Sequence, residues 1–297
     1  MSHGPERAEA ASGVVVVDKP SGWTSHDVVA RMRRLAGTRR VGHAGTLDPM
    51  ATGVLVLGLN RATRLLGHLT LTQKEYLATI RLGESTLTDD AEGETVSTAD
   101  AGALDEHSLS ESVASFVGDL EQVPSAVSAV KVGGRRAYQR VRAGEDVVLA
   151  TRRVHVAGIE IMAVRRQGRL VDVDVGVTCS SGTYVRAIAR DIGATLGVGG
   201  HLTMLRRTRV GAFGLPQART LEDLERRLVV VPLDEVARRN FPTFTADRQQ
   251  ATWVSHGRPL PGADLGAAGP VAVMTVDGAF LALYEQRGDD ARAVAVF

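Results

Sequence analysis

Asp48 has the setting that best fits chemistry in this chain, because it lies in an unusual loop. Residues 42–53 read Gly-His-Ala-Gly-Thr-Leu-Asp-Pro-Met-Ala-Thr-Gly, with three glycines, a proline, a histidine and one acid. Proline restricts the residue before it to extended conformations, so Asp48 should be held in a shaped loop. The apolar run at residues 54–57 predicts a buried strand directly after it. Loops on such scaffolds often carry functional residues, but the same pattern also fits an ordinary turn between a helix and a strand.

Most other chemistries lack the residues that they need. The chain has no Walker A pattern, no G-x-G-x-x-G after a strand, no H-E-x-x-H and no G-x-S-x-G. Its only cysteine, Cys179, cannot supply a cysteine-rich zinc site and ends an apolar strand pattern, as a small core residue would. If the chain is an enzyme, we expect no metal and no cofactor, which leaves side chains such as Asp48, tyrosines and basic residues.

Length and composition favour a globular protein of about two domains. The chain has 297 residues, of which 44% are hydrophobic, and no apolar run approaches the ~18 residues of a membrane span. Residues 1–12 are polar and small, so we expect a disordered tail there and no secretory signal. A single cysteine fits a reducing compartment. We therefore expect a cytoplasmic protein with no membrane partner.

The charges are unevenly distributed, although the net charge is only +1. Residues 81–120 hold one Arg against ten acids, and residues 121–220 hold sixteen Lys or Arg against seven acids. Such a basic half suits an anionic polymer, and the Arg side chain suits phosphate and base edges. The alternative is a GC-rich genome, which enriches Arg without any functional cause.

The elements that must position these residues follow from periodicity. Strands are predicted at residues 13–18, 54–57, 74–82, 154–165 and 170–178, and within 201–214. Helices are predicted from Ser25, over 61–69, from Ser108, after 180–183 and from Thr220. Residues 84–101 are acidic and rich in turn residues, which predicts a loop.

Two further segments have distinct compositions. Residues 124–152 lack a lasting period and are basic, so we expect a partly helical insertion there, and loops of this length are usually functional or disordered. From residue 243 the chain is rich in Pro, Gly and short apolar runs, which predicts a small β-rich module at 243–297. The boundary should fall within residues 232–242.

Seven separated segments resemble, in order, those of the TruB-type tRNA pseudouridine synthases, over about residues 13–230. They are Lys19-Pro20, the run from Gly42 to Pro49, Lys74-x-Tyr76, Asp90-Ala-Glu-Gly93, the Pro124 to Lys131 segment, Cys179-Ser-Ser-Gly-Thr-Tyr184-Val-Arg186, and Leu205-Arg206-Arg207. The run that contains Asp48 and the run that contains Arg186 are highly specific together.

The resemblance implies an α+β fold and an isomerase without a cofactor. The expected fold has a central mixed, mostly antiparallel sheet flanked by helices and loops at residues 13–240, and a PUA-like RNA-binding module at 243–297. The family detaches uracil from C1′ of the ribose, rotates it and rejoins it through C5. Enzymes that act on a base flip it out of its stack into an apolar or aromatic pocket.

The resemblance also implies roles for individual residues. Asp48 corresponds to the essential catalytic aspartate, which either attacks the sugar or takes a sugar proton, and Arg186 to the arginine that pairs with it. Active-site support is expected from Lys19 (alternatively a turn residue), His43, Tyr76, Asp90, Tyr184 and Leu205. RNA contacts are expected from Lys131, Arg135, Arg136, Arg140, Arg206 and Arg207.

The implied partner is the T arm of tRNA, with uridine 55 as the target. The insertion at 124–152 resembles the family's thumb-like segment, which the guide-RNA-dependent relatives lack. We therefore expect a stand-alone, monomeric enzyme with no guide RNA. Two alternatives are a non-catalytic tRNA-binding or RNA-chaperone protein, and a pseudouridine synthase with a different RNA target.

Overall fold

A computed structural model describes residues 12–125, 131–132, 135–136 and 150–297, with only the backbone of 131–132 and 135–136. The expected N-terminal tail therefore lies outside the described residues almost entirely. So does most of the insertion predicted at 124–152. No helix in these described ranges is long and apolar enough to cross a bilayer.

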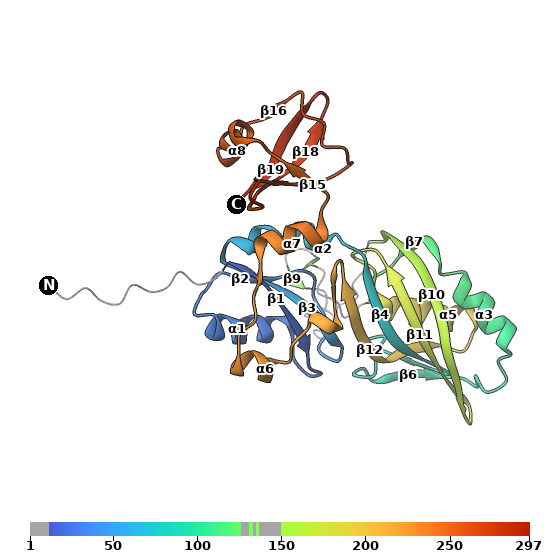
Figure 1. Cartoon of the computed structure of the whole chain (residues 1–297). Coiled ribbons are helices and arrows are strands. Elements are labelled where there is room, and N and C mark those ends of the chain that lie inside the picture. Colours follow the sequence, from blue (N-terminus) through green and yellow to red (C-terminus); the bar gives the residue numbers. More distant parts are fainter. Residues whose placement is uncertain (1–11, 126–130, 133–134, 137–149) are drawn as a thin grey trace.

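A ten-stranded mixed sheet forms the body of the chain (Figure 1). Its main path runs β14-β1-β3-β12-β4-β11-β10-β7, and every pair is antiparallel except β3 with β12. This confirms the mixed, mostly antiparallel α+β fold. The strands are β1 (Gly13–Lys19), β2 (Val41–His43), β3 (Thr52–Leu59), β4 (Lys74–Leu82), β7 (Gly118–Gln122), β10 (Arg152–Gln167), β11 (Leu170–Cys179), β12 (Gly200–Val210), β13 (Phe213–Gly214) and β14 (Val231–Pro232).

The sheet has a seam where β3 meets β12. The two strands pair at only two positions, Thr52 with Arg206 and Gly53 with Arg207. On one side of the seam, β1 and β3 pack against α1 (Ser25–Leu35) and α6 (Leu221–Arg226). On the other side, β4, β11 and β12 pack against α3 (Glu106–Ala114) and α5 (Val185–Thr195). The two sides of the seam thus have separate cores, which a short stretch of parallel pairing joins.

The long amphipathic elements lie where their periodicity predicted them. β4 has the predicted bounds, and Tyr76, Ala78, Ile80 and Leu82 face the core. Thr220 caps α6 by accepting a hydrogen bond from the backbone N–H of Asp223. These elements bury one continuous apolar face, so local pattern and tertiary packing agree.

Short elements and helix starts differ from the predictions. Residues 84–101 contain a hairpin of β5 (Glu84–Thr86) and β6 (Thr95–Thr98), and residues 60–70 split into η1 (Asn60–Arg64) and α2 (Leu66–Thr70). Thr24 and Asp105 cap α1 and α3, in place of Ser25 and Ser108. Tyr184 precedes α5 without any side-chain cap. Pairing within a hairpin and the identity of a cap depend on backbone geometry that composition leaves open.

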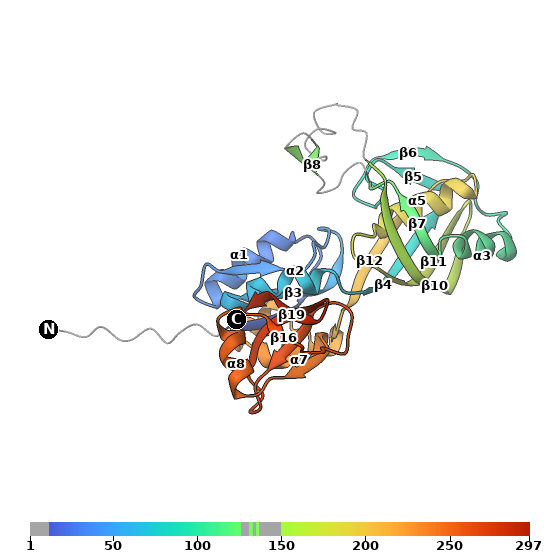
Figure 2. The same cartoon turned by 90° about the horizontal axis from the view of Figure 1, so that it is seen from above.

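The C-terminal residues form a separate five-stranded sheet in the order β15-β17-β18-β19-β16. It consists of β15 (Thr243–Thr245), β16 (Leu260–Pro261), β17 (Val271–Met274), β18 (Phe280–Arg287) and β19 (Asp290–Val296), with α8 (Arg248–Ser255) beside it. In both views it lies over the half that contains α1 and β3, away from β10 and α3 (Figures 1 and 2).

Apolar packing holds this C-terminal module to the body. Val236 and Ala237 of α7 (Leu233–Asn240) share one buried cluster with Met274, Phe280 and Leu283 of the module. The backbone N–H of Phe280 also donates to Asp234 Oδ1 at 2.8 Å. The predicted division of the chain between residues 240 and 243 remains a prediction.

Candidate active site

Asp48 lies in the connection between β2 and β3, and the start of α1 holds that connection. The hydroxyl of Ser25 accepts from the backbone N–H of Leu47 at 2.9 Å and lies 3.1 Å from the Leu47 carbonyl oxygen, to which it donates. Ser25 is buried beneath the loop. The residue just before Asp48 is therefore fixed to the scaffold at two atoms.

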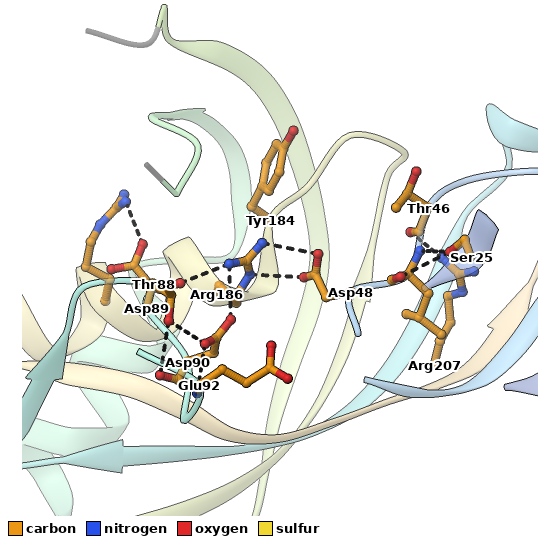
Figure 3. Close-up of polar contacts among 12 residues, drawn as sticks. Ser25, Thr46, Asp48, Thr88, Asp89, Asp90, Glu92, Tyr184, Arg186 and Arg207 are labelled. Atoms are coloured by element: carbon orange, nitrogen blue, oxygen red, sulfur yellow. Dashed lines mark hydrogen bonds and ion pairs between the residues drawn. The ribbon is translucent and has the colours of Figure 1, made fainter. Parts of the chain in front are cut away.

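Arg207, on the seam strand β12, binds backbone carbonyls on both sides of Asp48. Its Nε donates to the Val54 carbonyl at 2.7 Å, and its Nη1 and Nη2 donate to the carbonyls of Thr46 and Gly45, both at 3.2 Å. The residue is only 1% exposed. Backbone carbonyls of the loop therefore engage this buried guanidinium (Figure 3), and the RNA contact expected of Arg207 remains a prediction.

Lys19 holds the loop immediately after Asp48. Its Nζ donates to the carbonyl oxygens of Pro20, Trp23 and Pro49 at 2.9, 2.7 and 3.1 Å. Burial lowers the pKa of Lys19 to about 8, and the nearby charge of Asp48 opposes that shift. Lys19 thus ties its own turn to the backbone beside Asp48, which agrees with the turn alternative and places its charge near the loop.

The carboxylate of Asp48 meets the guanidinium of Arg186 at two points (Figure 3). Arg186 Nε lies 3.0 Å from Asp48 Oδ2, and Arg186 Nη2 donates to Asp48 Oδ1 at 3.1 Å. The Arg186 side chain is 6% exposed and the Asp48 side chain 33%. A two-point contact between arginine and a carboxylate fixes direction as well as distance. It leaves Asp48 partly open while its partner is buried.

Arg186 is itself held by the turn that follows β5. Its Nη1 donates to the Thr88 carbonyl at 2.9 Å and to Asp90 Oδ2 at 3.1 Å. The Asp90 side chain is 4% exposed, and its Oδ1 accepts from the Thr88 hydroxyl and from the backbone N–H of Glu92. Asp90 therefore contacts the predicted catalytic pair through Arg186. One guanidinium serves two carboxylates, of which only that of Asp48 is substantially exposed.

A cavity of about 340 Å³ opens beside Asp48. Five predicted residues line it together with Asp48, namely Tyr76, Tyr184, Arg186, Leu205 and Arg207. Burial raises the pKa of the Tyr76 phenol, so this wall of the cavity is uncharged at neutral pH. The cavity therefore combines a carboxylate with aromatic and apolar walls.

Comparison with known proteins assigns the chain. Residues 33–185 match the family model described as the N-terminal domain of TruB family pseudouridylate synthase. Residues 186–237 match that of the tRNA pseudouridylate synthase B C-terminal domain, and residues 241–297 that of the C terminus of tRNA pseudouridine synthase II. The chain belongs to the TruB family. Its fold and its class of enzyme were thus correctly predicted.

Relatives of this TruB-family chain match it over nearly its whole length. A protein named tRNA pseudouridine synthase B from Arthrobacter sp. (strain FB24) is 57% identical over 295 residues, which cover 96% of each chain. One of the same name from Streptomyces griseus is 54% identical over 299 residues, or 98% of this chain and 99% of the relative.

Solved structures agree on the fold. A chain in a crystal structure of a Cbf5-Nop10-Gar1 complex superposes with a TM-score of 0.72 at 29% identity, over 96% of this chain and 84% of that one. A chain in a structure of an H/ACA RNP bound to a substrate RNA containing 2′-deoxyuridine gives 0.71 at 26% identity, with the same coverage.

His43 is placed outside the cavity of this TruB-family chain. It lies on β2, where it pairs with Leu57 of β3, and its ring meets that of His26 edge to face at 5.8 Å. Burial lowers the pKa of His43, which favours a neutral imidazole. His43 therefore does not line the cavity described above, although its strand leads directly into the Asp48 loop.

Lys74 is a cavity residue for which no role was predicted. It lies two positions before Tyr76 on β4, and its Nζ donates to the carbonyls of Thr70 and Thr72 at 2.7 and 2.9 Å. Burial lowers the pKa of Lys74 to about 8. The alternation of β4 placed both side chains on one face, which is the signal that could have indicated it.

The predicted RNA-binding residues divide into two groups. Arg206 donates to Asp18 Oδ1 and Oδ2 at 3.1 and 2.7 Å, and its side chain is 32% exposed, so its RNA contact remains a prediction. In the insertion, β8 (Lys131–Val132) and β9 (Arg135–Arg136) form an antiparallel pair, which Figure 2 shows apart from the main sheet. The side chains of Lys131, Arg135 and Arg136, and the whole of Arg140, lie outside the described residues, so their roles remain predictions.

Proposed function

We propose that this chain isomerises uridine to pseudouridine in tRNA, at position 55 of the T loop, with Asp48 as the essential catalytic group. The relatives that are 57% and 54% identical to it carry the name tRNA pseudouridine synthase B, which supports tRNA as the substrate. The observation that carries the proposal is the two-point ion pair of Asp48 and Arg186 at a cavity bordered by Tyr76.

The reaction needs a flipped nucleotide, and the cavity suits one. Flipping costs a few kcal/mol, which stacking against aromatic or apolar walls helps to offset. In the proposal the uracil enters between Tyr76 and Leu205, and its ribose faces Asp48. The N1–C1′ bond breaks, a C5–C1′ bond forms, and the proton from C5 ends on N1. The products therefore balance without an oxidant or a second substrate.

The supporting residues have separable tasks in this proposal. Asp48 acts on the sugar, either by attacking C1′ or by taking a sugar proton. Arg186 orients the Asp48 carboxylate, and Asp90 orients Arg186 by accepting a hydrogen bond from its Nη1. Lys19 keeps the backbone after Asp48 in place, so its role is support of the loop. Tyr184 forms a wall of the cavity, and His43, which lies outside it, stabilises the opened RNA.

A basic surface next to the loop supports an RNA substrate. Residues 28–74 contain eight Arg or Lys and a single acid, which is Asp48. Among them, six arginines are exposed and form no ion pair with any described residue, namely Arg33, Arg34, Arg39, Arg40, Arg61 and Arg64. Phosphate contacts by such residues supply affinity and orientation but no sequence information. In the proposal this surface binds the backbone of the tRNA while the cavity takes the base.

We further propose that the enzyme is a monomer that works in the cytoplasm on the T arm without a guide RNA. The structural neighbours in the H/ACA RNP and in the Cbf5-Nop10-Gar1 complex are only 26% and 29% identical to the chain. The relatives named for tRNA are about twice as similar. The C-terminal module, residues 243–297, acts as an accessory RNA-binding surface in this scheme.

One experiment separates this proposal from its alternatives. The purified protein is incubated with an unmodified tRNA transcript, a T-arm stem-loop, and a transcript that carries cytidine at position 55. Pseudouridine is then mapped by carbodiimide chemistry. We expect product at position 55 of the first two RNAs and none in the third. Absence of product from every RNA would leave only an RNA-binding or chaperone role, and product elsewhere would refute only the site.

A further inference from the structure

Arg190 lies one helical turn after Arg186 on α5, and the two guanidinium groups bind consecutive acids of one turn. Arg186 Nη1 donates to Asp90 Oδ2 at 3.1 Å, and Arg190 Nη1 donates to Asp89 Oδ2 at 3.2 Å. Residues four apart lie on the same face of a helix, so α5 presents both cations to this turn. Arg190 is not among the residues that line the cavity, so it contacts the Asp89 carboxylate from outside the cavity.

The backbone of Asp89 explains how two neighbouring acids can face one helix. Successive side chains in an extended chain point to opposite sides. Asp89 has a φ of 59°, which turns the chain so that the carboxylates of Asp89 and Asp90 both reach α5 (Figure 3). Residues other than glycine rarely adopt this conformation, so other contacts must hold it. Arg190 supplies one of these contacts, and the hydrogen bond from the Leu202 N–H to the Asp89 carbonyl, 3.1 Å long, supplies another.

The same arginine also binds the end of β7. Arg190 Nη2 donates to the Val123 carbonyl at 2.9 Å. One residue earlier, the amide of Gln122 brackets the backbone of Tyr184, donating to its carbonyl at 3.1 Å and accepting from its N–H at 2.8 Å. The chain leaving β7 is therefore fixed to α5 at two points, one on each side of Arg186.

We propose that Arg190, acting through Asp89, is a positioning residue for the Asp48–Arg186 pair. It holds the turn in which the Thr88 carbonyl and the Asp90 carboxylate receive Arg186, and so it aims the Arg186 guanidinium at Asp48. The inference rests on the proposed function, because one of its readouts is the rate of pseudouridine formation.

The burial of these groups predicts the consequence of removing Arg190. The side chain of Asp89 is 11% exposed and that of Arg190 28%. Without its partner, a nearly buried carboxylate must take up a proton or move toward water. Either change frees the backbone of Asp89. Because Thr88 and Asp90 are its neighbours in the chain, their contacts with Arg186 then weaken.

The test compares Arg190→Met, Arg190→Lys and Asp89→Asn with the wild type. The rate constant is measured in single turnover at saturating enzyme, and the Kd for tRNA is measured separately. A displacement of about 1 Å remote from the reacting atoms can slow catalysis as much as ~100-fold, so we expect Arg190→Met to lower the rate constant about 10- to 100-fold. The Kd should stay within about twofold. Arg190→Lys should recover part of the rate, because an ammonium can still reach the Asp89 carboxylate but has no fork to bind Val123 and Asp191 at the same time.

Two further measurements sharpen the interpretation. The double variant with Arg190→Met and Asp89→Asn should be no slower than the worse single variant, since both single variants remove the ion pair of Arg190 and Asp89. Arg153→Met is the matched control, because Arg153 faces Glu121 of β7 but its side chain is 92% exposed. It should change neither the rate constant nor the Kd.

Hydrogen exchange provides a readout that does not depend on activity. The Leu202 amide, which bonds to the Asp89 carbonyl, should exchange faster in Arg190→Met and at the wild-type rate in Arg153→Met. Unchanged exchange, an unchanged rate constant, or a loss that lies wholly in the Kd would each overturn the inference. If the wild type forms no pseudouridine, the proposed function fails, and the exchange data alone decide whether Arg190 holds the turn.

Discussion

The Asp48 carboxylate and the Arg186 guanidinium join two halves of the sheet, although 138 residues separate them in the chain. Asp48 enters from the loop before β3, and Arg186 from the helix after β11. The seam between β3 and β12 brings these elements together, and Arg207 of β12 binds the Val54 carbonyl just after the Asp48 loop. Contacts at this seam should therefore affect catalysis, and substitutions at single positions can test them.

Asp48→Asn should abolish turnover and leave RNA binding nearly intact. The amide keeps the shape of the carboxylate but cannot act as a nucleophile or base, so we expect the rate constant to fall more than about 1,000-fold. Single-turnover assays and filter binding of tRNA measure the two effects separately. Asp18→Asn is the control, since Asp18 is also partly exposed and paired with an arginine, Arg206, and it should stay active. Equal losses of binding and turnover in Asp48→Asn would mean that Asp48 mainly shapes the loop.

Arg186→Met should lower both activity and stability. It leaves the buried carboxylate of Asp90 without its cation, which costs about 3–5 kcal/mol of unfolding free energy. Arg186→Lys should lose less stability but still lose activity, since one ammonium cannot make the two-point contact with Asp48. Urea denaturation measures the first effect. Arg209→Met is the control, because Arg209 forms an exposed pair with Glu75, and it should change the unfolding free energy by less than about 1 kcal/mol. An equally small loss in Arg186→Met would contradict the burial of the Asp90 carboxylate.

Lys19 should make stability depend on pH in the alkaline range. Burial lowers its pKa from 10.5 to about 8 in the folded chain. Between those values the unfolded chain binds more protons than the folded chain, so raising the pH favours folding. The free energy of unfolding of the wild type, minus that of Lys19→Met, should therefore increase from pH 8 to pH 10. A flat or falling difference in denaturant titrations at these pH values would show that Lys19 keeps an ordinary pKa.

Gly53→Ala should destabilise the seam. Gly53 has a φ of 100°, and a Cβ atom there would lie 2.2 Å from the Arg207 carbonyl oxygen. Gly22→Ala is a matched control, because Gly22 has a φ of 80° but nothing within 4 Å of its added Cβ. The control should lose about 1 kcal/mol from backbone strain alone. Gly53→Ala should lose clearly more free energy of unfolding, measured by thermal or urea unfolding. Equal losses in the two variants would mean that the backbone at the seam shifts to make room for the added Cβ.

Arg39→Gln with Arg40→Gln should weaken tRNA binding and flatten its salt dependence. If each arginine contacts a phosphate, the slope of log K against log salt should decrease by about 2 in magnitude. The control replaces two exposed arginines that already have helical partners, Arg226 with Glu222 and Arg239 with Glu235. That control should keep the wild-type slope. An unchanged slope in the Arg39 and Arg40 variant would exclude this surface from the RNA interface.

Several site residues could be predicted from the amino-acid sequence. Asp48 stood out by its loop, and the resemblance added Tyr76, Tyr184, Arg186 and Leu205, which the fold brings to one cavity. The sequence did not indicate that Arg207 is buried against loop carbonyls or that Arg206 pairs with Asp18. Their burial and ion pairing depend on neighbours far away in the chain.

The sequence by itself determined the long amphipathic elements, the shaped loop around Asp48 and the family, because these depend on local periodicity and on contiguous motifs. Only the tertiary structure decided which charges are buried and which partners they take. It showed that Lys19 and Arg207 are buried and bind backbone carbonyls of the Asp48 loop. It also placed Arg190 behind Arg186, through a left-handed Asp89 that no motif indicated. A buried charge needs a compensating partner, and that partner comes from whichever segment the fold brings within reach.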